Sequence, residues 1–252
     1  MNIVVMKFGG TSVAGTEKIN NIAKIVQSEL KNNKLIVVLS AMAGETNKLQ
    51  SYLDEFKAQN SIESDLVLTS GEQVTIGLLS AALNNIGVRS IPLLGWQVPI
   101  LTDENHEKAK ILQIDKKRIK EYFANYDVIV LAGFQGVNLS GRITSLGRGG
   151  SDTTAVAIAS AVDAERCDIY TDVDGVFTTD PNIEPNAKKI PVQHDYELSI
   201  YLSKELITDE YLLNLLNHPS VENIFSGPGF LTVTKNEKTS WENIIQDLDL
   251  QN

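Results

Sequence analysis

The sequence predicts a three-layer αβα sandwich, an α/β fold with a largely parallel central sheet. Segments of strand character alternate along the chain with segments of helix character, as in a β-α-β succession. Two strand segments, residues 35–39 and 128–132, are apolar throughout, which is typical of parallel strands covered by helices on both faces. Short glycine-rich or polar segments follow the strand segments, where α/β proteins collect their ligands.

The remaining elements fit the same alternation. Further strands are expected at residues 3–8, 88–93 and 169–171, with short strand candidates around 98–101. Apolar residues at helical spacing predict helices over 19–30, 46–58, 74–86, 119–123 and 155–162. Near the C-terminus, a helix at 212–216, a closing strand at 230–234 and one small amphipathic helix after residue 235 are expected.

Composition and charge narrow the classes of partner. The chain has 252 residues and is 42% hydrophobic, enough to bury a large core as one domain or two fused lobes. Its formal net charge of −10 argues against nucleic acid or an anionic membrane surface as a partner, because both require concentrated positive charge. An anionic ligand must therefore be held by a local site.

The cysteine count and the apolar runs favour a cytoplasmic protein. Cys167 is the one cysteine, so the chain forms no internal disulfide, and its apolar neighbours favour a buried structural thiol. The N-terminus enters a strand-like segment directly, without the basic and long apolar regions of a signal peptide. No apolar run in the sequence approaches the length expected of a membrane span.

A glycine-rich loop, residues 146–152, precedes a helical segment. Its three glycines let backbone amides approach an anion at a helix N-terminus, and Arg148 can fork onto a carboxylate or phosphate. Ser151 and Asp152 are expected to cap the helix with their side-chain oxygens. A glycine-rich connector in front of a capped helix is the alternative, and this loop alone slightly favours that alternative.

The other strand ends favour the anion site. Glycine-rich or polar segments follow four strands, at residues 7–12, 40–44, 133–136 and 172–175. In the first, Gly9 and Gly10 present amides to phosphate oxygens while Lys7 supplies a point charge for the β- and γ-phosphates. A single such turn is weak support, but four at one edge of a sheet predict an anion-binding site.

Several other sites are excluded by spacing. Gly10 and Gly15 have Walker A spacing, but Thr16 occupies the position of the lysine. No G-x-G-x-x-G motif follows a strand, so the sequence lacks a dinucleotide fingerprint. The segment 172–177 does not form a calcium loop, since Val176 and Phe177 occupy required positions. The three histidines are scattered without ligand spacing, so no metal site or catalytic triad is expected.

Five segments together resemble the catalytic domain of aspartate kinases (aspartokinases), in the amino acid kinase family. They read KFGGTSV at 7–13, SAMAGETN at 40–47, SGE at 70–72, LGRGGSD at 146–152 and TDVDGVFTTDP at 171–181. The match runs in order from residue 3 to about 190, and the joint pattern is far more specific than any one segment. The family's amino acid kinase fold agrees with the αβα sandwich predicted above.

The resemblance implies phosphoryl transfer from ATP, with Mg²⁺, to the side-chain carboxylate of L-aspartate, giving 4-phospho-L-aspartate and ADP. This is the first step of the lysine, threonine and methionine pathway. By similarity, the catalytic residues are Lys7 and Asp152. The same similarity assigns substrate binding to Thr46, Glu72, Phe134, Arg148 and Ser151, and ATP binding to Lys7, Gly9, Gly10, Ser40, Thr171, Asp172, Phe177 and Asp180. Without the resemblance, Glu72 reads as an exposed helix residue, Thr46 as an N-cap and Asp152 as a capping carboxylate.

The sequence departs from the family on the nucleotide side. Phe177 stands where the family usually has tyrosine, and Asn182 stands where it has arginine. A later family segment with a second phosphate-contacting lysine is not recognisable, although Lys204 is a candidate substitute. Two alternatives therefore stay open. In the first, the chain is a degenerate homologue that binds an amino acid, or partners a complete kinase, without turnover. In the second, the chain phosphorylates another amino acid or a carbamate.

The resemblance also sets expectations for domains and partners. We expect a single amino acid kinase domain over 1–252, with a substrate lobe at about 1–165 and a nucleotide lobe at about 166–252. The short polar tail leaves no room for the ACT regulatory domains of many aspartate kinases, so lysine and threonine are expected to have no effect. The expected partners are the small molecules aspartate and ATP, with no nucleic acid and no membrane, and a homodimer stays open.

Overall fold

A five-stranded parallel sheet forms the centre of the molecule in the computed structural model, which describes residues 2–31, 33–147, 149–170, 221–227 and 230–235. The strand order is β3-β6-β2-β1-β9. The strands are β1 (Asn2–Phe8), β2 (Asn33–Leu39), β3 (Ser90–Leu93), β6 (Val128–Ala132) and β9 (Arg166–Tyr170). Each neighbouring pair runs parallel. The predicted parallel sheet is therefore confirmed, with β2 at its centre.

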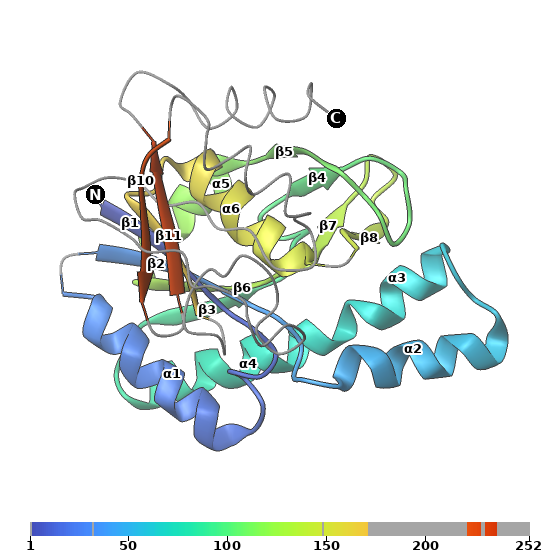
Figure 1. The fold of residues 1–252 in the computed structure, drawn as a ribbon, viewed down its shortest axis with the longest axis horizontal. Helices are drawn as coiled ribbons and strands as arrows, with labels where there is room; N and C mark the ends of the chain where they lie inside the picture. The colour runs from blue at the N-terminus through green and yellow to red at the C-terminus, as the bar shows by residue number, and fades with distance from the viewer. Residues whose placement is uncertain (1, 32, 148, 171–220, 228–229, 236–252) are drawn as a thin grey trace, which may run out of the picture.

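Helices cover both faces of this sheet (Figure 1). Helices α1 (Thr16–Glu29) and α4 (Ser70–Asn85) pack on one face, against side chains such as Val4, Met6 and Val37. Helices α5 (Lys116–Tyr122) and α6 (Gly150–Val162) pack on the other face, against Val5 and Ile36. Because side chains alternate along a strand, each strand contributes to both clusters, and the three predicted layers are confirmed.

The apolar residues of α4 do not all face the core. Ile76, Leu79 and Leu83 are buried, whereas Val74 and Leu78 are exposed by 55% and 36%. The helix interior carries apolar residues on more than one side, so periodicity does not select a single face. The buried thiol of Cys167 agrees with the prediction, and burial raises its pKa.

Two helices and a small sheet project to one side of the parallel sheet (Figure 1). The helices are α2 (Glu45–Phe56) and α3 (Ile62–Leu68), and the sheet order is β5-β4-β7-β8. Its strands are β4 (Ile100–Thr102), β5 (Ile111–Ile114), β7 (Gln135–Val137) and β8 (Ile143–Ser145). Sequence patterns missed α3, β5 and β7, and β7 begins within the segment 133–136 that was expected only to follow a strand. Helix α3 is only one capped stretch of seven residues, with Ser61 and Ser64 forming its capping box, so its periodicity is too short to recognise.

The expected closing strand has a different partner. Strand β11 (Phe230–Lys235) exists, but it pairs antiparallel with β10 (Val221–Gly227) in a separate two-stranded sheet. It therefore does not extend the hydrogen bonding of the parallel sheet, although it lies next to β9. The helices expected at 212–216 and after residue 235 lie outside the described residues.

One described stretch, Ile62–Asn85, is long and apolar enough to cross a membrane by length and hydropathy alone. It comprises α3 and α4, and half of its most apolar window is buried inside the molecule. It also buries the carboxylates of Asp65 and Glu72. These features are those of a core helix, because α4 packs on the parallel sheet.

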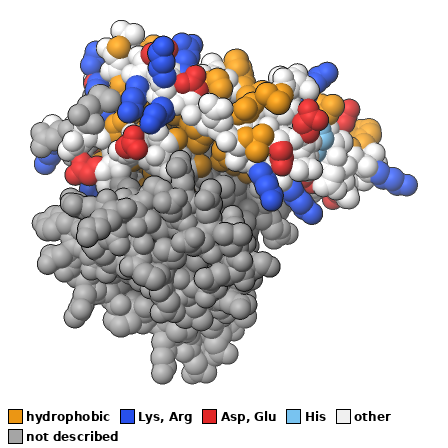
Figure 2. Space-filling model, turned by 90° about the horizontal axis from the view of Figure 1, so that it is seen from above, with side chains coloured by type: hydrophobic (Ala, Val, Ile, Leu, Met, Phe, Trp, Pro, Cys, Tyr) orange, Lys and Arg blue, Asp and Glu red, His pale blue; other side chains and the backbone are white. Residues whose placement is uncertain are grey.

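Charged side chains are mixed on the face shown in Figure 2. Blue basic and red acidic groups alternate with apolar ones over the described part of that face. No single sign of charge dominates over the described part of this face.

Candidate active site

The candidate site residues gather where the parallel strands end. Lys7 is near the end of β1, Ser40 follows β2, and Gly133 follows β6. These three strands are neighbours and run in the same direction, so their carboxyl ends meet at one edge of the sheet. The first turn of α6 reaches this edge as well. The structure thus brings together residues that are more than 140 positions apart in the sequence.

Lys7 and Asp152 form a buried ion pair at this edge. The Lys7 ammonium contacts Asp152 Oδ1, and the two residues are only 7% and 4% exposed. Asp152 lies in the first turn of α6, whose dipole favours a negative charge there. The pair gives the site a fixed cation whose position is set by a carboxylate from the adjacent helix layer.

Ser151 and Asp152 do not cap α6, and in this respect the prediction was wrong. The N-cap is Gly149 in a left-handed conformation with φ of 67°, and it makes no side-chain cap hydrogen bond. Ser151 and Asp152 follow inside the first turn and face the sheet edge instead. Ser151 Oγ lies 2.7 Å from Ser40 Oγ, which joins α6 to the end of β2. Both side chains therefore serve the site rather than the helix end.

The turns after β1 and β2 pack backbone against backbone. The Ala43 amide donates to the Gly10 carbonyl at 3.0 Å. A Cβ atom at Gly10 would lie 2.8 Å from the carbonyl oxygen of Ala41, so no larger residue fits without movement. A Cβ atom at Gly9 would lie 3.7 Å from Lys7 Nζ. Glycine at these positions lets the backbone approach the lysine and any anion bound beside it.

Glu72 is buried at the start of α4 and not exposed as the simpler interpretation held. It is 3% exposed, and its Oε1 accepts a hydrogen bond from the Ala41 amide at 2.9 Å. Within the described part of the chain, Oε2 is buried and has no hydrogen-bond partner. Burial raises the pKa of Glu72 to about 7, partly offset by the Ala41 amide. A buried carboxylate oxygen without a partner is suited to accept from a cationic ligand group.

Phe134 connects β6 to the glycine loop. It has a positive φ of 68°, and its amide donates to Thr154 Oγ1 on α6 at 3.0 Å. Its carbonyl accepts from the Leu146 amide at 2.9 Å. A Cβ atom at Gly150 would lie 2.9 Å from the Phe134 ring. Phe134 thus holds the loop and the start of α6 together by backbone contacts.

The other predicted site residues divide into two groups. Thr46 is exposed in the first turn of α2, whose N-cap is Gly44, so Thr46 is not itself the cap. Arg148 and the predicted ATP-binding residues Thr171, Asp172, Phe177 and Asp180 lie outside the described residues, as do Asn182 and Lys204. Among the described residues, no group of three or more His, Cys, Asp or Glu side chains is placed to hold a metal ion.

Sequence patterns missed two supporting residues. Thr75 Oγ1 donates to the Ser40 carbonyl at 2.9 Å, one helical turn after Glu72 on α4. Thr154 holds the Phe134 amide from α6, as described above. Both are buried hydroxyl residues within helices, where their spacing from Glu72 and Asp152 was the only available signal. Thr75 fixes the end of β2 against α4, and Thr154 fixes the end of β6 against α6.

The described edge combines a buried cation, a pair of hydroxyl groups, close-packed glycine turns and a buried carboxylate with an open oxygen. Together with the parallel αβα sandwich, these features define an α/β protein whose sheet edge is chemically suited to a small ligand with both anionic and cationic groups. The model of the amino acid kinase family matches residues 2–211, and the chain therefore belongs to the amino acid kinase family. This confirms the family resemblance found in the sequence.

Named relatives are similar to most of the chain. The aspartokinase of Rickettsia felis is 52% identical over 195 residues, 75% of this chain and 49% of the relative. The aspartate kinase of Pseudomonas putida is 44% identical over 256 residues, 98% of this chain and 62% of the relative. The chain therefore spans about half to three fifths of the length of these relatives.

The fold also matches a solved structure, Escherichia coli aspartokinase III in complex with aspartate and ADP. The TM-score is 0.64 at 22% identity, over 98% of this chain and 83% of the other. A likeness at this identity supports the fold. A second family model, described as the N-terminal part of scaffold protein Nfu/NifU, matches residues 178–249 and overlaps the first model over 178–211.

Proposed function

We propose that the protein is an aspartate kinase that transfers a phosphoryl group from ATP, with Mg²⁺, to the side-chain carboxylate of L-aspartate. The products are 4-phospho-L-aspartate and ADP, which would enter lysine, threonine and methionine biosynthesis. The observation that carries the proposal is the buried Lys7–Asp152 pair beside the glycine turn at the carboxyl edge of the sheet. Membership of the amino acid kinase family and similarity to proteins named aspartokinase support the acceptor.

The acceptor chemistry suits these side chains. A carboxylate is already ionised at pH 7, so the reaction needs no general base and depends on positioning and charge neutralisation. In this proposal, Lys7 neutralises charge on the transferring phosphoryl group while the amides of Gly9 and Gly10 and the hydroxyl of Ser40 hold its oxygens. Asp152 keeps the lysine ammonium at the sheet edge.

The amino-acid half of the site would be built around Glu72. Its open Oε2 would accept from the α-ammonium of aspartate, which replaces an unsatisfied buried oxygen with a charge-assisted hydrogen bond. Arg148 would bind the α-carboxylate, and Thr46, Phe134 and Ser151 would complete the contacts. The Ser40–Ser151 contact places Ser151 beside a residue proposed to hold the phosphoryl group.

The described residues fit a magnesium ion that is bound mainly by the phosphates of the nucleotide. Mg²⁺ is usually held by one or two carboxylates together with substrate phosphates and water, so a large protein cluster is not required. Asp152 is the described carboxylate beside Lys7 and would contribute to holding the ion. When bound, Mg²⁺ supplies neutralisation of phosphate charge.

The nucleotide half of the proposal rests on sequence alone. Residues 1–165 would form the substrate lobe, and residues 166–252 would form the nucleotide lobe with Thr171, Asp172, Phe177 and Asp180. Escherichia coli aspartokinase III, which shares the fold, was solved with aspartate and ADP. On this side, Phe177 and Asn182 replace the tyrosine and arginine that are usual in the family.

A second function is favoured by the match of residues 178–249 to the Nfu/NifU N-terminal model. In this second function, a segment that resembles a scaffold protein takes the place of the nucleotide lobe. The chain would then bind aspartate, or act as a partner of a complete kinase, without turnover. The Rickettsia felis relative aligns over 75% of the chain, so a quarter of the chain has no counterpart in that alignment. The Pseudomonas putida relative aligns over 98%, which favours a continuous kinase.

We also propose a cytoplasmic location, as the buried free thiol of Cys167 suits a reducing compartment. The proposed partners are aspartate and ATP, with a homodimer open. Neither nucleic acid nor a membrane is proposed as a partner, given the net charge of −10.

Two measurements on the full chain separate the functions. Calorimetry with aspartate tests binding, and a hydroxamate assay with ATP, Mg²⁺ and aspartate detects the acyl phosphate directly. A kinase gives binding and hydroxamate, and the Lys7→Ala variant gives binding with hydroxamate formation slowed about a hundredfold or more. Binding without hydroxamate in the unmodified protein would select the second function. Absence of aspartate binding would contradict both the kinase and the aspartate-binding protein, and would leave only the partner of a complete kinase.

A further inference from the structure

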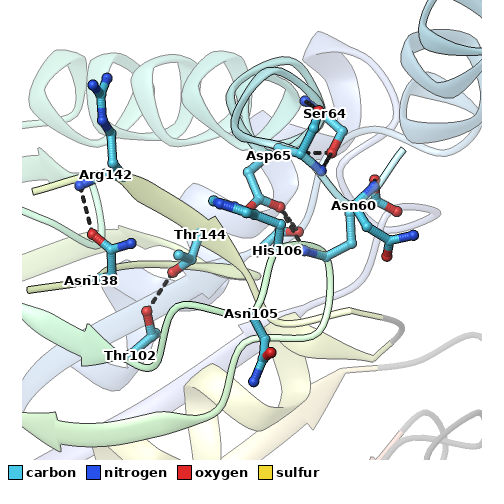
Figure 3. A network of polar contacts seen from close by, with 12 residues as sticks. Asn60, Ser64, Asp65, Thr102, Asn105, His106, Asn138, Arg142 and Thr144 are labelled. Carbon is cyan, nitrogen blue, oxygen red and sulfur yellow. Dashed lines mark hydrogen bonds and ion pairs between the residues drawn. The ribbon is translucent and has the colours of Figure 1, made fainter. Parts of the chain in front are cut away.

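A second buried carboxylate, Asp65 on α3, lies outside the proposed reaction site. Asp65 is fully buried, and its side chain accepts three hydrogen bonds. Figure 3 shows Asp65 and the polar residues around it. The donors are His106 Nδ1 at 2.7 Å, the Glu107 amide at 2.9 Å and Ser145 Oγ at 2.6 Å. A buried carboxylate with this many partners is costly to disturb, so its contacts fix the relative positions of the elements that supply them.

The arrangement is not a catalytic triad. In a triad, the histidine takes a proton from the serine and the carboxylate holds the histidine. Here His106 and Ser145 both bond to the carboxylate of Asp65, and Ser145 donates its proton to Asp65 directly. The network therefore has a holding role and no activated nucleophile.

The network is joined to the glycine loop at two points. Ser145 is the last residue of β8 and directly precedes Leu146, the first residue of the loop. Farther along, Gly147 has a positive φ of 79°, and a Cβ atom there would lie 2.9 Å from the Glu107 carbonyl oxygen. The loop thus rests on the Glu107 backbone, whose amide is bonded to Asp65.

The same residue is also joined to the helix that carries Glu72. The Asp65 carbonyl accepts from both the amide and the hydroxyl of Thr69, at 3.1 and 2.8 Å. Thr69 is the N-cap of α4, and Glu72 lies in the first turn of that helix. The Thr69 carbonyl in turn accepts from Gln135 Nε2, next to Phe134, at 3.2 Å. Asp65 is therefore linked to both halves of the proposed amino-acid site, through Thr69 to the start of α4 and through Ser145 and Glu107 to the glycine loop.

We infer that Asp65, His106 and Ser145 are positioning residues that set the glycine loop and the start of α6 relative to Glu72, and so determine the affinity for the amino-acid substrate. The inference rests on the proposed function for its choice of ligand. The positioning itself is a property of the fold, and it can be measured without ligand. His106 would act through Asp65 and Glu107 and would not contact the substrate.

The test compares three variants of the full chain. His106→Ala removes the donor to Asp65, and His106→Asn retains an N–H group that can take the place of Nδ1. The control is Thr144→Val, which removes a buried hydroxyl one residue before Ser145. Thr144 Oγ1 bonds to Thr102 Oγ1 at 2.6 Å and not to Asp65, so its loss destabilises the same small sheet without releasing the loop.

Backbone hydrogen exchange of residues 145–152 is measured first, without ligand. We expect exchange at least about tenfold faster in His106→Ala, as loss of a hydrogen bond to a charged group costs more than one tenfold step. His106→Asn and Thr144→Val should stay within about threefold of the unmodified protein. Unchanged exchange in His106→Ala, or equal acceleration in Thr144→Val, would overturn the inference.

Aspartate affinity by calorimetry is the second readout. His106→Ala should raise the Kd about tenfold, with His106→Asn restoring most of the affinity. An unaltered Kd in His106→Ala would overturn the link to substrate binding. If the unmodified protein does not bind aspartate, the proposed function fails, while the exchange measurement still decides whether the network positions the loop.

Discussion

The Lys7 ammonium and the Asp152 carboxylate, 145 positions apart in sequence, form a buried ion pair between the end of β1 and the first turn of α6. Removing charges from water is costly, and a buried pair repays that cost only when both partners are present. The pair is therefore poor support for stability by itself. Its position beside the glycine turn agrees with the role proposed for it in phosphoryl transfer.

Replacing Lys7 with alanine should lower kcat about a hundredfold or more, which is the scale for losing one preorganised electrostatic contact to a transition state. The hydroxamate assay at saturating substrates measures this change. Circular dichroism provides the control for a retained fold. Near-normal turnover in a folded Lys7→Ala variant would contradict the catalytic assignment.

Loss of one partner of the pair should also cost stability. Asp152→Ala should lower the free energy of unfolding by about 3–5 kcal/mol, since it leaves an uncompensated buried lysine. The double variant Lys7→Met/Asp152→Leu should recover most of that loss, as apolar groups of similar volume replace both charges. Urea unfolding at pH 7 compares the variants. Additive losses in the double variant would show that the two charges are not coupled.

The raised pKa of Glu72 predicts that ionising this residue costs stability. Its pKa is about 7 in the folded protein against an ordinary value of 4.5, so the folded state binds the proton more tightly. Stability due to Glu72 is therefore fully present below pH 4.5 and is lost as the pH rises to about 7. The difference of 2.5 pKa units corresponds to about 3 kcal/mol.

Glu72→Gln tests this sign directly, because glutamine stays neutral and keeps an acceptor for the Ala41 amide. The variant should be more stable than the unmodified protein by about 3 kcal/mol at pH 8. The advantage should nearly vanish at pH 4.5. Urea unfolding at the two pH values measures the difference, and an advantage that does not change with pH would argue against a neutral, buried Glu72.

Glu72 and Arg148 should act mainly on aspartate binding. Each would make a charge-assisted hydrogen bond worth about 1.5–3 kcal/mol, so alanine at either position should raise the KM for aspartate far more than the KM for ATP. Steady-state kinetics with each substrate varied in turn provide the test. Equal effects on both substrates would place these residues elsewhere in the reaction.

Gly133 should not tolerate a side chain. A Cβ atom there would lie 2.5 Å from Ser151 Cβ and 2.9 Å from Ser151 Cα. Gly133→Ala should therefore push Ser151 away from Ser40 and cost about 1–3 kcal/mol, with weaker aspartate binding. Gly77→Ala is the matched control, because a Cβ atom at Gly77 on α4 meets no atom within 4 Å.

The control should gain about 0.5–1 kcal/mol, since alanine is the better helix former. Thermal unfolding measures stability, and calorimetry measures aspartate affinity. Similar behaviour of the two alanine variants would mean that the close approach of β6 to α6 is not required.

The sequence by itself determined the layers of the fold and the places where the site forms. Apolar runs and helical spacing predicted β1, β2, β6 and most of the helices, because burial imposes a period on each element separately. Glycine turns at strand ends predicted one functional edge, as parallel strands end together. Elements too short to show a period, such as α3 and β5, were missed.

Only the tertiary structure decided which side chains meet. Ser151 and Asp152 have the pattern of helix caps in sequence, yet they contact Ser40 and Lys7 from the adjacent helix layer. Without the family resemblance, the local pattern of Glu72 is that of an exposed helix residue, whereas the packing of α4 buries it against the Ala41 amide. The strand expected to close the parallel sheet pairs with β10 instead. These outcomes depend on contacts between distant segments, and local spacing carries no information about partners that approach through space.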